Sequence, residues 1–477
     1  MSSESSTRID RRSFFDHVGG GIYGAALGSI LSQDVYGDEE RADSRRIYDL
    51  RPQTAQIQPR AKSVIHLFMN GGPSQMDLFD PKPELQKNHG KSYFEKIAGE
   101  VESPNAAGAL MRSPFRFARH GDCGMWVSEL MPHLANCVDD IALIRSMHTT
   151  NLTHEPALFQ IHSGNTLPGL PSLGSWVTYG LGTANQSLPA YVVLDDPKGL
   201  PVNRSQSWQC GYLPPVYQGT RFRSQGSPVL DLKPGYEEPS NVTHLERDLI
   251  AKLDRLHQRK RSSRPELGAR IASYELAARM QLAASDALDL DQETAATQKM
   301  YGLNQEPLDS YGRRCLIARR LVERGVRFVQ LYLNMQPFDH HSGLEKGLRS
   351  ICGRTDQPIA ALLKDLKTRG LLDSTLVVWG GEFGRLPIAQ SKNGRDHNKN
   401  AMVSWMAGGG VRGGLSHGTT DEIGFAAVED KVSVPDWHAT MLHILGLDYQ
   451  RLSYYRNGLE EKLTGVFEAR VVKEILA

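Results

Sequence analysis

The chain has almost no excess of charge and few cysteines. Its 477 residues carry 55 lysines and arginines against 54 aspartates and glutamates, a net charge of +1. A nucleic-acid-binding domain usually has a basic face, so nucleic acid is not an expected partner. The five cysteines, at 123, 137, 210, 315 and 352, form no C-x-x-C pair. They indicate neither a zinc ribbon nor a disulfide framework, although the spacing allows one or two bridges in an exported protein.

The N-terminus lacks an apolar run that is long enough to span a bilayer. Its Gly/Ala-rich stretch, Val18–Leu31, is short against the roughly 20 residues that a helical span needs. Paired arginines, Arg11 and Arg12, precede this stretch, which is typical of a twin-arginine export signal. A disordered tail with a chance arginine pair is the alternative. We expect a periplasmic or otherwise exported protein. The absence of a clear A-x-A cleavage site leaves room for an uncleaved anchor and peripheral membrane association.

Short apolar runs that alternate with helical patterns predict an α/β protein. We expect a targeting segment over 1–32, a linker over 33–60 and one main domain over 61–477, with a loop excursion at 197–235 and a helical insertion at 236–310. The expected strands cover 63–69, 141–145, 190–195, 326–333, 375–379 and 402–406, and the expected helices include 129–138, 316–324, 345–368 and 435–445.

Polar side chains that bind metals follow several of these apolar runs. Leu376–Trp379 leads directly into Gly380-Gly381-Glu382, as a buried parallel strand does when it places a carboxylate at the mouth of a sheet. Carboxylates and imidazoles on strand-end loops predict a hydrolytic site with a divalent metal. The candidates in such a setting are Asp339, His341, Glu382, Asp396 and His397.

A second polar cluster, from Met147 to Pro156, follows the strand expected at 141–145. A strand, a polar loop and a helix N-terminus are where α/β hydrolases present a nucleophile, because helix amides stabilise the developing anion. The simpler interpretation is a helix start, in which Thr153 caps the helix and Glu155 lies in its first turn. The two interpretations are compatible.

Six short motifs taken together resemble one family. It is the twin-arginine-exported, sulfatase-like family that carries only a domain-of-unknown-function label, within the alkaline phosphatase superfamily. The resemblance covers about residues 60 to 450 and implies a three-layer α/β sandwich with a mostly parallel central sheet. The motifs are NGGPSQMD at 70–77, HEPA at 154–157, PSLG at 171–174, GEFGR at 381–385, GRDH at 394–397 and VPDWHAT at 434–440.

The resemblance implies a metal site at the carboxyl edge of the sheet. Asp339 and His341 look like the superfamily's Asp-then-His pair, although the family spacing is usually longer. Glu382 keeps the carboxylate of the Asp-His-Gly turn, and Phe383 removes its second ligand. His397, beside Asp396, looks like the distal histidine. Asn70 stands where sulfatases have acidic ligands, and a neutral amide binds a dication more weakly.

The nucleophile position departs most from the sulfatase pattern. His154 stands where sulfatases have the modified cysteine, and Leu158 stands where they have an arginine. Three interpretations remain open. His154 is a covalent nucleophile, or it is a ligand or acid/base while Thr153 or a metal-activated water attacks, or catalysis has been lost. Arg385 either clamps an anionic substrate or pairs with Glu382.

The resemblance leads to a metal-dependent hydrolase of sulfate or phosphate esters as the first hypothesis. The cofactor would be zinc, calcium, magnesium or manganese, and the partner a sulfated or phosphorylated small molecule or glycan. The main alternative is a non-catalytic envelope protein that binds an anionic glycan, and a transferase is a third. Two further histidines, His438 and His443, lie among apolar residues and are expected to pack rather than to bind metal.

Overall fold

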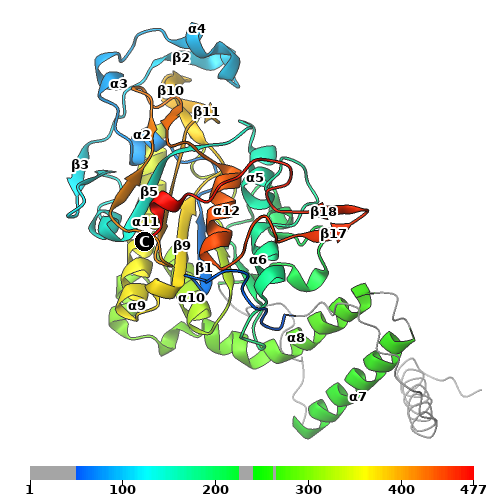
Figure 1. Cartoon of the computed structure of the whole chain (residues 1–477). Coiled ribbons are helices and arrows are strands. Elements are labelled where there is room, and N and C mark those ends of the chain that lie inside the picture. The colour runs from blue at the N-terminus through cyan, green and yellow to red at the C-terminus, as the bar shows by residue number, and fades with distance from the viewer. Residues whose placement is uncertain (1–49, 225–239, 261–264) are drawn as a thin grey trace, which may run out of the picture. The chain divides into compact units, whose positions relative to one another are not determined.

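The computed structural model describes residues 50–224, 240–260 and 265–477 (Figure 1). The expected export signal therefore lies outside the described residues. The described residues divide into two compact units. One contains 50–224 and 272–477, and the other contains α7 (Ser240–Arg259) and the first residues of α8 (Pro265–Leu288).

A nine-stranded sheet forms the centre of the larger unit, in the order β13-β5-β12-β9-β1-β8-β6-β7, with β16 paired to β5. Within the sheet, β12 alone runs antiparallel to its neighbours β5 and β9. The prediction of an α/β fold with a mostly parallel sheet is confirmed. The strands are β1 (Ser63–Phe68), β5 (Ile141–His148), β6 (Tyr191–Leu194), β7 (Thr220–Phe222), β8 (Phe328–Leu331), β9 (Thr375–Gly380), β12 (Met402–Ala407), β13 (Leu415–His417) and β16 (Val432–Ser433).

Helices cover both faces of this sheet, which gives three layers (Figure 1). Because side chains alternate along a strand, His66 and Phe68 of β1 face the same side. They pack on Trp437 of α12 (Val434–Ile444) and on His162 of α5 (His154–Ser163), and α6 (Leu173–Leu181) contacts the same side of the sheet. The opposite face contacts α10 (Asp309–Glu323), which packs on α11 (Leu344–Thr368).

A small antiparallel sheet, in the order β11-β10-β2, lies outside the central sheet. Its strands are β2 (Ala107–Leu110), β10 (Gly384–Gln390) and β11 (Gly394–Asn398), and it shares a separate apolar cluster with α2 (Gln75–Leu78). The prediction that Asp396 and His397 lie on a strand-end loop is wrong, because both are on β11. The sequence GRDHN has no apolar alternation that would mark it as a strand.

The prediction of a helix over 129–138 is also wrong. A hairpin of β3 (Phe117–His120) and β4 (Met125–Ser128) ends there, and a 3₁₀ segment covers Leu134–Asp140. Pro132 lies inside the predicted helix and interrupts its hydrogen bonding. The remaining α-helices and strands of the described residues are α3 (Pro83–Lys87), α4 (Phe94–Ile97), α9 (Ala295–Met300), β14 (Thr419–Thr420) with β15 (Ala427–Glu429), and β17 (Tyr454–Arg456) with β18 (Leu459–Glu461).

All five cysteines are free. Residues 50–60 are the last part of the expected linker, and their backbone amides donate hydrogen bonds to the rest of the larger unit. The amide of Gln53, for example, donates to the Leu181 carbonyl at 2.9 Å. Across the described ranges, the helices are all too short or too polar to cross a bilayer.

Three buried histidines, His66, His162 and His438, fill the space between the sheet and the helices α5 and α12. The side-chain amide of Gln330 donates to Nδ1 of His66 at 3.2 Å and of His162 at 3.3 Å, and His438 Nε2 donates to the Ile161 carbonyl at 2.8 Å. Burial lowers the pKa of His66 to about 3 and that of His438 to about 4, and it holds the pKa of His162 well below its usual value. All three are therefore neutral in the folded protein near neutral pH.

We expect the free energy of unfolding to fall as the pH drops below about 6.5, where histidines of the unfolded chain take up protons that the folded chain does not. Each such histidine removes about 1.4 kcal/mol per pH unit, so the three remove roughly 4 kcal/mol between about pH 6 and pH 5. Denaturant unfolding across this range measures the slope. His438→Gln keeps a donor for Ile161 but cannot take up a proton, so it should reduce the slope by about 1.4 kcal/mol per pH unit. An unchanged slope would contradict the prediction.

Candidate metal centre

Four polar side chains follow strands that end at the same edge of the central sheet. Asn70 follows β1, Asp339 follows β8 and Glu382 follows β9, and these three strands are parallel neighbours. His154 follows β5, which runs in the same direction as β9 because both are antiparallel to β12. Carboxyl ends of parallel strands are where α/β proteins place their ligand sites. The structure therefore brings these four predicted residues to one edge of the central sheet.

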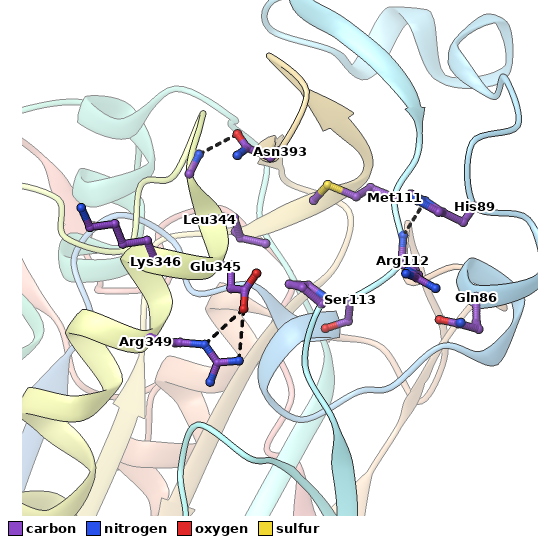
Figure 2. Close-up of a pocket in the computed structure, with 12 residues that line it drawn as sticks. Gln86, His89, Met111, Arg112, Ser113, Leu344, Glu345, Lys346, Arg349 and Asn393 are labelled. Atoms are coloured by element: carbon purple, nitrogen blue, oxygen red, sulfur yellow. Dashed lines mark hydrogen bonds and ion pairs between the residues drawn. The ribbon is translucent and has the colours of Figure 1, made fainter.

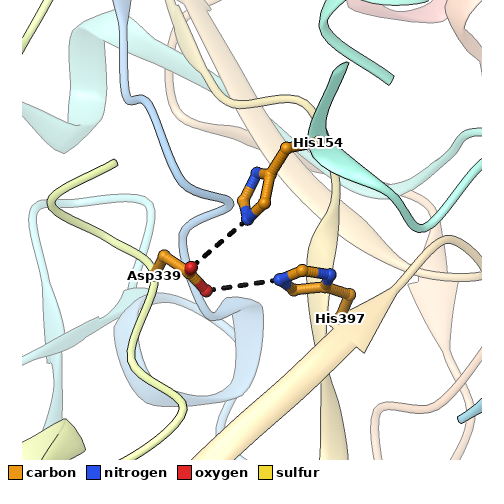
Figure 3. Close-up of side chains that lie close together, drawn as sticks. All are labelled: His154, Asp339 and His397. Atoms are coloured by element: carbon orange, nitrogen blue, oxygen red, sulfur yellow. Dashed lines mark hydrogen bonds and ion pairs between the residues drawn. The ribbon is translucent and has the colours of Figure 1, made fainter. Parts of the chain in front are cut away.

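The Asp339 carboxylate lies at the centre of a group of three imidazoles. Its Oδ2 is 3.4 Å from Nε2 of His154, and its Oδ1 is 3.3 Å from Nε2 of His397 (Figure 3). Nε2 of His341 is 2.9 Å from Oδ1 of the same carboxylate. The three histidines come from the start of α5, from β11 and from the loop after β8, so the fold brings together distant parts of the chain.

Each of these histidines is held at its other ring nitrogen. Nδ1 of His154 bonds Oε1 of Glu382 at 2.7 Å, and Nδ1 of His397 pairs with Oε2 of Glu102 at 2.5 Å. Nδ1 of His341 bonds the side-chain oxygen of Gln390. An acceptor at Nδ1 fixes the tautomer and directs the Nε2 lone pair outward, which is the usual arrangement around metal-ligating histidines.

The carboxylates determine the charge state of the group. Burial alone would lower the pKa of His154, but hydrogen bonds with Asp339 and Glu382 raise it to about 9. Burial alone would raise the pKa of Asp339, but hydrogen bonds from the three histidines and the charge of Arg385 hold it far below its usual range. Asp339 is therefore ionised, and a dication could replace the proton that His154 carries.

Arg385 takes neither of the two roles expected for it. Its guanidinium pairs with Asp339 at 2.8 Å instead of Glu382, and it donates to the carbonyls of Gly71, Gly72 and Arg395. With a side chain that is 1% exposed, it is not placed as a clamp on a substrate. Its observed contacts hold Asp339 in position.

Three other candidate residues, Asp396, Asn70 and Thr153, do not contact the Asp339 carboxylate in the hydrogen bonds of the described residues. Both oxygens of Asp396 accept backbone amides, from Ser103 and from His397, each at 2.9 Å. The side-chain oxygen of Asn70 accepts the Leu333 amide at 3.2 Å. Thr153 is the N-cap residue of α5, as expected, but its exposed side chain makes no capping hydrogen bond. Asp396 and Asn70 thus brace the loops around the site.

The donor set fits a divalent metal. His154, Asp339 and His397 each offer an atom within 4.8 Å of the other two, and His341, Asp396 and His397 form a second such group. Donor atoms on a tetrahedral zinc ion lie about 3.3 Å apart, given bonds of roughly 2.0–2.1 Å. Nε2 of His154 has about this spacing to Oδ2 of Asp339, at 3.4 Å, and Nε2 of His397 has it to Oδ1, at 3.3 Å, so each imidazole faces a different oxygen of the carboxylate. The first group is therefore the better candidate for a ligand set.

Two residues that hold the histidines were missed by the sequence analysis. Glu102 stands in the loop before β2, and Gln390 ends β10. Neither belongs to a pattern that predicts a site, because each becomes relevant only when β10 and β11 fold against the edge of the central sheet. Glu382 was expected to be a ligand, but its oxygens accept the Gly71 amide at 2.9 and 3.2 Å and face His154.

A family model described as "Protein of unknown function (DUF1501)" matches residues 61–476. The chain belongs to this family. The family predicted from the motifs is thereby confirmed, whereas no curated protein matches the chain.

Several solved structures are similar to this DUF1501 chain at low identity. The lipoteichoic acid synthase LtaP from Listeria monocytogenes is 7% identical over 86% of this chain and 78% of its own, with a TM-score of 0.38. The phosphonate monoester hydrolase SpPMH from Silicibacter pomeroyi is 10% identical over 88% and 76%, with a TM-score of 0.35. The periplasmic domain of EcEptC from Escherichia coli, in complex with Zn, is 8% identical over 90% and 99%, with a TM-score of 0.36. These superpositions are loose, so the chemistry of the site rests on the chain's own residues.

Proposed function

We propose that the protein is a divalent-metal-dependent hydrolase of sulfate or phosphate esters. The observation that carries this proposal is the arrangement of His154, His341 and His397, each held at Nδ1 and facing the Asp339 carboxylate through Nε2. Structural ion pairs do not require this repeated orientation, whereas metal ligands do.

Among zinc, calcium, magnesium and manganese, the imidazole donors favour zinc. His154, Asp339 and His397 would hold the ion, which would supply Lewis acidity to an ester oxygen and lower the pKa of a water. Arg385 orients Asp339, and Glu382 orients His154. Among described residues, none with a hydroxyl or thiol side chain is bonded to His154, Asp339 or His397. This supports attack by water instead of a covalent Ser, Thr or Cys.

Elemental analysis of the purified protein and a screen of small esters test the proposal. Near-stoichiometric metal is expected, together with metal-dependent turnover of 4-nitrophenyl sulfate, 4-nitrophenyl phosphate or a phosphonate monoester. Protein that carries no metal, and that cannot be loaded with any of the four ions, would refute it.

A binding protein for an anionic glycan is the second candidate. It is favoured by His154, which stands between two carboxylates at the position where the superfamily has its nucleophile. Bound metal with no turnover of any sulfate or phosphate ester would support this candidate over the hydrolase.

We further propose that Arg11 and Arg12 direct export by the twin-arginine route, so that the site acts in the periplasm or outside the cell. The paired arginines before a short apolar segment support this. In cell fractionation, the full chain should leave the cytoplasm, whereas a variant with Arg11→Lys and Arg12→Lys should stay there. Equal export of both would contradict the route.

A further inference from the structure

A pocket of about 830 Å³ lies beside the candidate metal centre. The start of α11 and Asn393 line it on one side, and the Met111–Pro114 segment lines it on the other (Figure 2). Ligand pockets in proteins have volumes of roughly 300–1,000 Å³, so this one can hold a ligand larger than a single ester group. The proposed hydrolysis by itself does not require such a pocket.

The pocket carries positive charge that the protein does not neutralise. Arg112, Lys346 and Arg349 line it, together with the single carboxylate of Glu345. Arg349 pairs with Glu345 at 3.2 Å and with Glu129 at 3.0 Å. Within the described part of the chain, Arg112 and Lys346 have no carboxylate partner. Because the chain as a whole has a net charge of only +1, two unpaired cations in one pocket favour an anionic ligand.

The uncharged part of the lining suits a hydroxylated ligand. Gln86, Ser113 and Asn393 offer hydrogen-bonding groups, and Met111 and Pro114 add apolar surface. Asn393 accepts the Gly343 amide at its side-chain oxygen, at 2.8 Å, which leaves its Nδ2 hydrogens available for a ligand. Alternating hydroxyls and apolar faces are features of a sugar, and sulfate or phosphate groups on that sugar would meet the cations.

Each wall of the pocket is connected to a segment that carries a histidine of the metal centre. Gly343 lies two residues after His341, so their Cα atoms are at most about 7 Å apart. The Met111 carbonyl accepts Nη2 of Arg395 at 3.0 Å, and His397 lies two residues further along β11. The two walls therefore place the pocket within two residues of His341 along the chain, and one hydrogen bond from the strand that carries His397.

We propose that this pocket is a subsite for an anionic oligosaccharide, which holds the sugar next to the one whose ester is presented to the metal centre. This inference rests on the proposed function for the position of the ester. It assigns Arg112 and Lys346 as the residues that select a chain with sulfate or phosphate groups on neighbouring sugars.

Binding of a sulfated dextran oligosaccharide to the full-length protein, at low salt, tests the proposal, with unsulfated dextran of the same length as the comparison ligand. The double variant R112A/K346A should bind the sulfated chain about tenfold more weakly and with a smaller dependence on salt. The double variant K252A/R259A, which removes two exposed cations from α7, should bind as the unchanged protein does.

Three outcomes would overturn the subsite: unchanged binding by R112A/K346A, equal binding of the unsulfated dextran, or equal binding of a linear polyphosphate, which has the charge but not the sugar. Failure of the proposed hydrolase is a separate result, because it is measured by metal content and by turnover of small esters. The Asp339→Asn variant also distinguishes failure of the subsite from failure of the hydrolase, since it should lose the metal and still bind the sulfated chain.

Discussion

Asp339→Asn is expected to lose the bound metal almost completely while the protein remains folded. The carboxylate of Asp339 is the group that faces Nε2 of His154, His341 and His397. An amide keeps the shape and one oxygen but removes the negative charge, and neutral oxygen ligands bind dications more weakly. Arg385 keeps its bonds to three backbone carbonyls, which should limit the cost in stability. Elemental analysis and thermal unfolding, with and without added zinc, measure the two effects.

Two further variants, which should lose less metal affinity or none, test this prediction more strictly. Glu382→Gln leaves every proposed ligand in place but weakens the orientation of His154, so metal affinity should fall by about 10- to 100-fold instead of being lost. His443→Gln is the matched control, since this half-buried histidine lies on α12 and outside both groups of candidate ligands. Normal metal content in Asp339→Asn would place the ion elsewhere. Normal affinity in Glu382→Gln would show that Glu382 does not position His154.

The sequence was sufficient to locate the strand-end part of the site. Apolar runs such as Leu376–Trp379 predict buried parallel strands, and the polar residue that follows such a strand lies at the carboxyl edge of the sheet. Glu382 and Asp339 are predicted in this way, whereas His154 is predicted from the resemblance, at the position of the sulfatase nucleophile. The signal is local, because one strand and the residues after it are enough to produce it.

The rest of the site depends on contacts between residues far apart in the chain. His397 was identified as a candidate, but its place on a second sheet was not, because GRDHN has the composition of a loop. It is a buried strand because its charged side chains find buried partners, such as Asp77 for Arg395. No local pattern gives this pairing, nor that of Glu102 with His397. For the same reason, Arg385 could not be assigned to Asp339 from the sequence.

Breaking the buried ion pair between Asp77 of α2 and Arg395 of β11 is expected to be strongly destabilising. Both side chains are fully buried, and the guanidinium bonds the carboxylate twice, at 2.6 and 3.2 Å. Arg395 also donates to the carbonyls of Leu386 and Met111. Arg395→Met leaves the Asp77 carboxylate buried without its counter-charge, and the loss of one partner of a buried pair costs about 3–5 kcal/mol. Denaturant unfolding measures this cost.

The double variant with Asp77→Leu and Arg395→Met distinguishes the cost of an unpaired buried charge from the cost of disturbed packing in the core. Removal of both charges leaves no uncompensated ion, so the double variant should be less destabilised than the sum of the two single changes. Lys367→Met is the control, because it breaks a surface pair with Asp140 and should cost less than about 1 kcal/mol. If Arg395→Met costs no more than this control, the buried pair does not hold β11. If it does hold β11, Arg395→Met should also weaken metal binding, because His397 lies two residues along the same strand.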